Sequence, residues 1–148
     1  GLSMGGYGSL IYGTKHPELF AACAPLSAAV WNDDNIADMP QTDWTNYKFN
    51  DLFGTNLEGK KHLTETWYKN SILKIVATTP AEKLNTVRFY IDCGDDDFLI
   101  KGNMELHALL TDRKVNHEFR VRDGAHNWTY WRTALPEVLK FVSESFHR

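Results

Sequence analysis

The sequence has only two cysteines, no cluster of basic residues and no long apolar run, and each absence excludes a class of protein. Cys23 and Cys93 are too few for a disulfide framework, and they lack the C-x-x-C spacing of zinc and redox sites. We interpret them as buried free thiols, with a bridge between adjacent strands as the alternative. No apolar stretch is long enough to cross a bilayer. A net charge of −3 without a Lys/Arg cluster argues against nucleic acid and anionic membranes as partners.

The remaining composition is that of an ordinary globular domain. The 148 residues are 43% hydrophobic and 24% charged, which is enough for one domain with a substantial core. The spacing of His, Asp and Glu offers no convincing metal site, so we expect neither a metal nor another cofactor. The chain begins inside a motif, and we therefore expect it to be one part of a longer or divided protein.

Strand and helix patterns alternate along most of the chain. Apolar residues at helical spacing predict helices over 4–15, 71–77, 80–84, 103–113 and 130–146. Apolar or alternating runs predict strands over 20–24, 87–92 and 117–121. This order implies βαβ units and an α/β fold, with a mostly parallel sheet flanked by helices.

Residues 28–70 interrupt this alternation with a polar but aromatic-rich segment. We expect short helices and loops here, in an insertion where substrate contacts could lie. Most of its large aromatic side chains are more typical of a core than of a binding surface. Because Trp and Tyr faces stack on sugar and phenol rings, Trp31 in this segment and Trp128 further along the chain are candidate substrate contacts.

The first five residues, Gly1-Leu2-Ser3-Met4-Gly5, match the G-x-S-x-G pattern of a nucleophile elbow. In such an elbow the serine stands on a strained turn between strand and helix, and small residues on either side prevent clashes. The start of the following helix directs N–H groups toward a developing oxyanion, and the Met4 N–H is the expected first donor. The pattern alone is only moderately specific, because an inert glycine-rich turn would also match it.

An acid and a histidine follow in the order that a serine nucleophile of this kind requires. The segment Asp95-Asp96-Asp97 comes directly after the clearest strand, and residue pattern alone does not distinguish the three carboxylates. Of the six histidines, only His126 lies in a loop between the last strand and the last helix. We expect His126 to accept the proton of Ser3, and an aspartate to orient the imidazole.

With these residues in place, the chain resembles the α/β-hydrolase esterase family that includes esterase D, tributyrin esterases, and the feruloyl and acetyl xylan esterases of carbohydrate esterase family 1. The likeness spans essentially all 148 residues. It rests on three motifs, which are Gly1-Leu2-Ser3-Met4-Gly5-Gly6, Gly94-Asp95-Asp96-Asp97-Phe98-Leu99, and Gly124-Ala125-His126-Asn127-Trp128 followed by Tyr130-Trp131. The second motif resembles the family's G-x-x-D-x-L and selects Asp97 as the acid. The third resembles G-G-H-x-W/F, with Ala125 replacing the second glycine.

The resemblance implies that residues 1–148 form the C-terminal part of an α/β-hydrolase domain, from the elbow to the last helix. It implies a serine carboxylic-ester hydrolase acting on acyl or feruloyl esters of plant polysaccharide, with export from the cell common among such enzymes. An S-formylglutathione hydrolase-like thioesterase and a non-catalytic glycan-binding relative are the alternatives. The family's first strands and its second oxyanion-hole donor would come from the N-terminal half of the same fold, which we expect as a partner.

Overall fold

The computed structural model describes residues 1–146 and has a three-stranded parallel sheet at its centre. The strands are β1 (Ala22–Cys23), β2 (Arg88–Gly94) and β3 (His117–Arg122), and they lie in the order β1-β2-β3. Because β2 is the middle strand, its residues 89–94 are all buried. The mixed α/β architecture with a parallel sheet confirms the predicted fold class.

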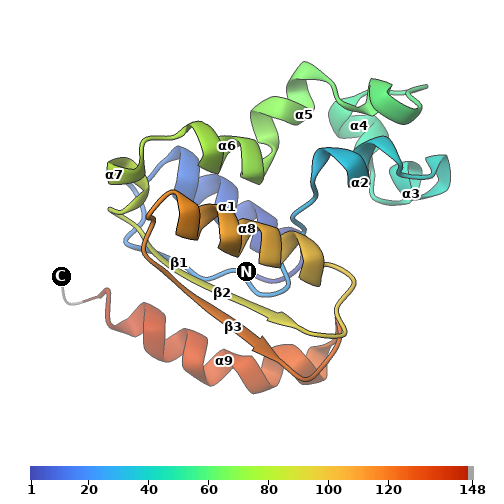
Figure 1. Ribbon diagram of the computed structural model, residues 1–148. Helices are drawn as coiled ribbons and strands as arrows, with labels where there is room; N and C mark the ends of the chain where they lie inside the picture. The colour runs from blue at the N-terminus through green and yellow to red at the C-terminus, as the bar shows by residue number, and fades with distance from the viewer. Residues whose placement is uncertain (147–148) are drawn as a thin grey trace.

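Helices cover both faces of the sheet (Figure 1). On one face lie α1 (Met4–Lys15), α6 (Ile72–Thr78) and α8 (Ile100–Asp112), and α9 (Trp128–Ser143) lies on the other. A short helix, α7 (Ala81–Leu84), leads into β2. Each face therefore has its own apolar core, one centred on Phe89 and Ile91 and the other on Tyr90 and Phe141. No helix in the described residues is long and apolar enough to cross a membrane.

Residues 33–70 form short helices that project beyond the sheet (Figure 1). They are α2 (Asp33–Ala37), α3 (Gln41–Asn46), α4 (Phe49–Phe53), the 3₁₀ helix η1 (Gly59–His62) and α5 (Glu65–Asn70). A separate apolar cluster around Trp44 and Trp67 holds them together, so these two aromatic residues are core residues of this segment. The ring of His62 stacks on Trp44 with 3.8 Å between centroids.

Three elements differ most from their predicted bounds, and the other predicted helices and strands agree within one or two residues at each end. The strand expected over 20–24 is reduced to β1, because Phe20 is exposed beside Tyr12 and Pro25 has no N–H for a ladder. Helix α8 begins at Ile100 rather than at 103. Glycine is a poor helix former, so Gly102 weakens the helix pattern of the sequence at this end. In the structure Gly102 lets the helix approach Val30, because a Cβ at this position would lie 2.0 Å from the Val30 carbonyl oxygen. Helix α9 spans Trp128–Ser143 instead of 130–146.

Both cysteines are buried free thiols, so the alternative of a bridge between strands is wrong. Burial raises the pKa of Cys23 to about 12. Burial, followed by the nearby Asp97 carboxylate, also raises the pKa of Cys93 to about 12. Neither thiol is therefore a competing nucleophile at neutral pH, because the reactive form is the thiolate.

Candidate active site

Ser3 stands at the start of α1 in a backbone conformation that few L-residues adopt. Its φ of 54° and ψ of −121° make it one of the positive-φ residues of the chain. Such a conformation costs on the order of 1–3 kcal/mol and persists only where surrounding contacts impose it. Here the Ser3 N–H donates to the Leu26 carbonyl at 2.9 Å, and the Ser3 carbonyl accepts from the Ala29 N–H at 3.1 Å.

Of the two glycines of the motif, Gly1 has the close-packing role that the motif suggests and Gly5 does not. A Cβ at Gly1 would lie 2.3 Å from the Gly5 carbonyl oxygen, so this position requires glycine. Gly6 also packs closely, because a Cβ there would lie 3.0 Å from the Ala28 Cα. A Cβ at Gly5, the second glycine of the motif, would meet no heavy atom within 4 Å among the described residues.

The structure brings together the three predicted polar residues, Ser3, His126 and Asp97, at the carboxyl edge of the sheet. His126 Nε2 lies 2.9 Å from Ser3 Oγ, and His126 Nδ1 lies 2.8 Å from Asp97 Oδ2. The Asp97 side chain is fully buried, and its Oδ1 accepts a hydrogen bond from the Leu99 N–H at 2.9 Å. A carboxylate beside Nδ1 favours the tautomer with the proton on Nδ1, which leaves Nε2 free to accept a proton from Ser3.

The other two aspartates of the Asp95-Asp96-Asp97 run face solvent. Asp95 Oδ1 accepts a hydrogen bond from the Gly124 N–H at 3.0 Å and so holds the loop that carries His126. The Asp96 side chain lies with those of Asp95 and Asp123 in an exposed acidic group. The three neighbouring carboxylates thus differ in burial, and only Asp97 contacts the imidazole.

Aromatic rings enclose the imidazole of His126. The centroid of the Phe98 ring lies 4.7 Å from that of the imidazole, and the centroid of the Trp131 ring lies 4.9 Å from it with an interplanar angle of 86°. Phe98 also approaches Trp31, with 6.4 Å between centroids. Neither Phe98 nor Trp131 could be assigned to the site from the sequence, since exposed aromatic residues and helix-face aromatic residues carry no chemical signature of their own.

A mostly apolar cavity of about 380 Å³ lies beside the elbow. Met4 and Tyr7 of α1, Trp31, and aromatic side chains of the short helices form its walls. Burial raises the pKa of Tyr7 to about 12, and its hydroxyl donates to the Asn70 carbonyl at 2.8 Å. Of the two predicted substrate contacts, Trp31 lines this cavity. Trp128 does not line it, and instead lies exposed against Trp131.

Met4 is the first residue of α1, so its N–H has no partner one turn earlier within the helix. Its side chain is exposed and forms part of the cavity wall. The N–H of Met4 is thus placed at a helix N-terminus directly after Ser3, where a negatively charged oxygen is favoured. Its role as an oxyanion donor stays a prediction.

Comparison with known proteins identifies the family. A family model described as "Putative esterase" matches residues 1–142. The chain belongs to this esterase family. It is 26% identical over 155 residues to an acetyl esterase of Caldicellulosiruptor saccharolyticus, covering 97% of this chain and 53% of that protein.

Solved structures of related enzymes have the same fold as this member of the esterase family. A ferulic acid esterase matches with 34% identity and a TM-score of 0.71, over 99% of this chain and 50% of its own. A substrate-bound, fluorophosphonate-binding serine hydrolase of Staphylococcus aureus matches with 26% identity and a TM-score of 0.73, over 96% and 52%. The chain therefore spans about half the length of these relatives.

Proposed function

We propose that this chain carries the reacting groups of a serine carboxylic-ester hydrolase. The single observation that carries the proposal is the continuous pair of contacts from Ser3 Oγ to His126 Nε2 at 2.9 Å and from His126 Nδ1 to Asp97 Oδ2 at 2.8 Å. Membership of the esterase family and the likeness to serine hydrolases support it. No metal or cofactor takes part in the proposed reaction.

In the first half of the reaction, Ser3 Oγ attacks the ester carbonyl carbon while His126 Nε2 takes the hydroxyl proton. The tetrahedral intermediate places negative charge on the former carbonyl oxygen, and the Met4 N–H donates to it. The C–O bond to the alcohol then breaks, and His126 returns the proton to the departing alkoxide. In the second half, water attacks the acyl-Ser3 ester by the same proton transfers and releases the acid. Asp97 keeps Nδ1 protonated and stabilises the imidazolium in both halves.

We propose acyl or feruloyl esters of plant polysaccharide as the substrates. An apolar cavity with Trp31 in its wall suits an aromatic or acyl group, and the named relatives include an acetyl esterase and a ferulic acid esterase. A panel of methyl ferulate, acetylated xylan and S-formylglutathione will rank the ester and thioester classes. Turnover of S-formylglutathione alone would favour the thioesterase, and binding of xylan without any turnover would favour a non-catalytic glycan-binding protein.

Removing the Trp31 ring is expected to affect a large acyl group more than a small one. In Trp31→Leu we expect KM for methyl ferulate to rise about 10-fold. This is the size of effect expected when one aromatic stacking contact and the apolar area that it buries are lost. We expect KM for p-nitrophenyl acetate to change little. Trp128→Leu provides the matched control, because this tryptophan lies outside the cavity wall. Equal changes of KM for both esters in Trp31→Leu would contradict the assignment.

We also propose that the chain works with a further segment that completes the same fold, since its relatives are about twice as long. An open groove of about 490 Å³ supports this, because it runs along α1, β1 and α9 and is lined by small residues such as Gly5 and Gly8. The segment would supply the second oxyanion donor, and the loss of one such donor typically lowers the rate by roughly 10²–10³. We expect the 148-residue chain alone to hydrolyse p-nitrophenyl acetate slower than the completed protein by at least that factor. Equal rates would contradict this proposal.

A further inference from the structure

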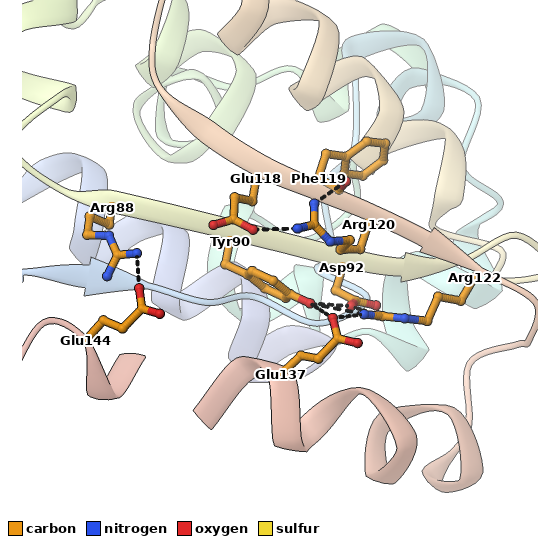
Figure 2. Close-up of polar contacts among 9 residues, drawn as sticks. All are labelled: Arg88, Tyr90, Asp92, Glu118, Phe119, Arg120, Arg122, Glu137 and Glu144. Carbon is orange, nitrogen blue, oxygen red and sulfur yellow. Dashed lines mark hydrogen bonds and ion pairs between the residues drawn. The ribbon is translucent and has the colours of Figure 1, made fainter. Parts of the chain in front are cut away.

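A second buried carboxylate, Asp92, lies behind the candidate active site and has no role in the proposed reaction. Its side chain is fully buried on β2, facing α9. Oδ1 accepts a hydrogen bond from the Tyr130 hydroxyl at 2.5 Å, and Oδ2 lies 3.2 Å from the Tyr90 hydroxyl and pairs with the Arg122 guanidinium. Figure 2 shows Tyr90 and Arg122 reaching this carboxylate between the sheet and α9, while Glu137 of α9 contacts the Tyr90 hydroxyl and the Arg122 guanidinium. A buried charge requires such donors, because an unpaired one is strongly destabilising.

The Tyr130 ring connects this carboxylate to the loop that carries His126. Gly124, two residues before His126, has a φ of 142°, and a Cβ there would lie only 2.6 Å from Tyr130 Cδ2. The Tyr130 ring thus occupies the space beside Gly124 and limits how the loop can bend. The Tyr130 N–H donates to Asn127 Oδ1 at 3.0 Å, which fixes the first turn of α9 directly after the loop.

A second connection runs from Asp92 to the imidazole through Ser27 and Trp131. The Ser27 N–H donates to the Asp92 carbonyl oxygen at 2.7 Å, and Ser27 Oγ accepts from Trp131 Nε1–H at 3.0 Å. The Trp131 ring packs against the His126 imidazole at nearly a right angle. Tyr130 and Trp131, which are consecutive in α9, are therefore both connected to Asp92 of β2, Tyr130 directly and Trp131 through Ser27. Tyr130 packs against the His126 loop, and Trp131 packs against the imidazole.

We propose that Tyr130, held by Asp92, is a positioning residue that fixes the His126 loop so that Nε2 stays within hydrogen-bonding distance of Ser3 Oγ. This inference rests on the proposed function, because the position of the imidazole matters only if it transfers the Ser3 proton. Burial and the adjacent carboxylate raise the pKa of Tyr130, so the hydroxyl remains a donor across the physiological range. Tyr130 acts by keeping the imidazole in place, since a displacement of a reacting group by about 1 Å can cost roughly 10²-fold in rate.

The chain offers a closely matched pair of variants to test this. Tyr130→Phe and Tyr90→Phe each remove one phenol hydroxyl from the same Asp92 carboxylate. Both tyrosines are buried, at 5% and 2% exposure. Tyr90 packs against Phe141 of α9, with 5.2 Å between ring centroids, whereas Tyr130 packs against the His126 loop. A merely structural role predicts similar losses of thermal stability and similar activities for the two variants.

The measurements use the completed enzyme, which is this chain together with the further segment of the same fold. With p-nitrophenyl acetate as substrate, we expect Tyr130→Phe to lower kcat about 10-fold or more with KM unchanged. We also expect it to slow the labelling of Ser3 by a fluorophosphonate. We expect Tyr90→Phe to keep kcat within about 2-fold. Equal kcat values in the two variants would overturn the proposal. If circular dichroism shows Tyr130→Phe to be unfolded, Asp92→Asn decides instead, because it keeps the volume of the side chain and replaces the carboxylate that holds the Tyr130 hydroxyl. A lowered kcat in that variant then supports positioning, and an unchanged kcat overturns it.

Ser3→Ala, measured in parallel, separates this inference from the proposed function. If hydrolysis is lost in Ser3→Ala but retained in Tyr130→Phe, only the positioning role is overturned. If hydrolysis survives in Ser3→Ala, the proposed function itself is wrong, and the positioning role falls with it.

Discussion

Replacing Ser3 by alanine is expected to lower kcat for ester hydrolysis by roughly 10⁵-fold, with little change in KM. The reason is that the variant has no oxygen to form the acyl-enzyme, and only the binding and oxyanion contributions survive. The fold should persist, since Ala occupies the same backbone position and the Ser3 N–H and carbonyl keep their bonds to Leu26 and Ala29. The measurement is steady-state hydrolysis of p-nitrophenyl acetate by the completed enzyme.

Ser9→Ala is the matched control for this substitution. Ser9 lies on the same helix, and its hydroxyl donates to the Gly5 carbonyl one turn earlier, at 2.9 Å. We expect Ser9→Ala to retain the wild-type rate within about 2-fold, because the hydroxyl bonds to none of the three reacting residues and alanine is the smaller side chain. A comparable loss in both variants would show that damage to α1, rather than removal of a nucleophile, lowers the rate.

Replacing Asp97 by asparagine is expected to lower kcat by about 10⁴-fold, again with little change in KM. An amide can donate to Nδ1 and so favours the wrong imidazole tautomer, with the proton on Nε2 facing Ser3. It also removes the charge that stabilises the imidazolium. The substitution keeps the volume of a fully buried side chain, so loss of packing does not explain the result. A pH–rate profile and circular dichroism of the variant will separate loss of chemistry from loss of fold.

Asp96→Asn provides the control for the acid, because Asp96 is the neighbouring residue but faces solvent. We expect this variant to keep the wild-type kcat. If Asp96→Asn instead shows the large loss and Asp97→Asn remains active, the assignment of the acid is wrong.

The sequence predicted the architecture well because each buried element leaves a clear local pattern. The large apolar residues Phe89, Tyr90 and Ile91 before Gly94 predicted the central strand β2, which is buried throughout residues 89–94. The sequence could not predict that β1 would shrink to two residues. That outcome depends on Phe20 finding a position beside Tyr12 at the surface, a tertiary contact that has no local signature.

The candidate site was predictable where a motif restricts the backbone, and it was not predictable where only tertiary contacts matter. The positive φ of Ser3 and the loop position of His126 follow from glycine-rich motifs. In contrast, Asp92 reads as one more residue of a strand, and nothing in its neighbourhood along the chain indicates the Tyr130 hydroxyl 38 positions later. Buried polar contacts of this kind form between elements that only the fold brings together.

The most direct test of the central claim is mass spectrometry of the completed enzyme after reaction with a fluorophosphonate, which forms a covalent bond with an activated serine. We expect one adduct per chain, located by peptide mapping on Ser3, and its disappearance in Ser3→Ala. We also expect strongly slowed labelling in His126→Ala, because the proton acceptor is then missing. An adduct on any other residue, or no adduct in a protein that hydrolyses esters, would contradict the assignment of Ser3 as the nucleophile.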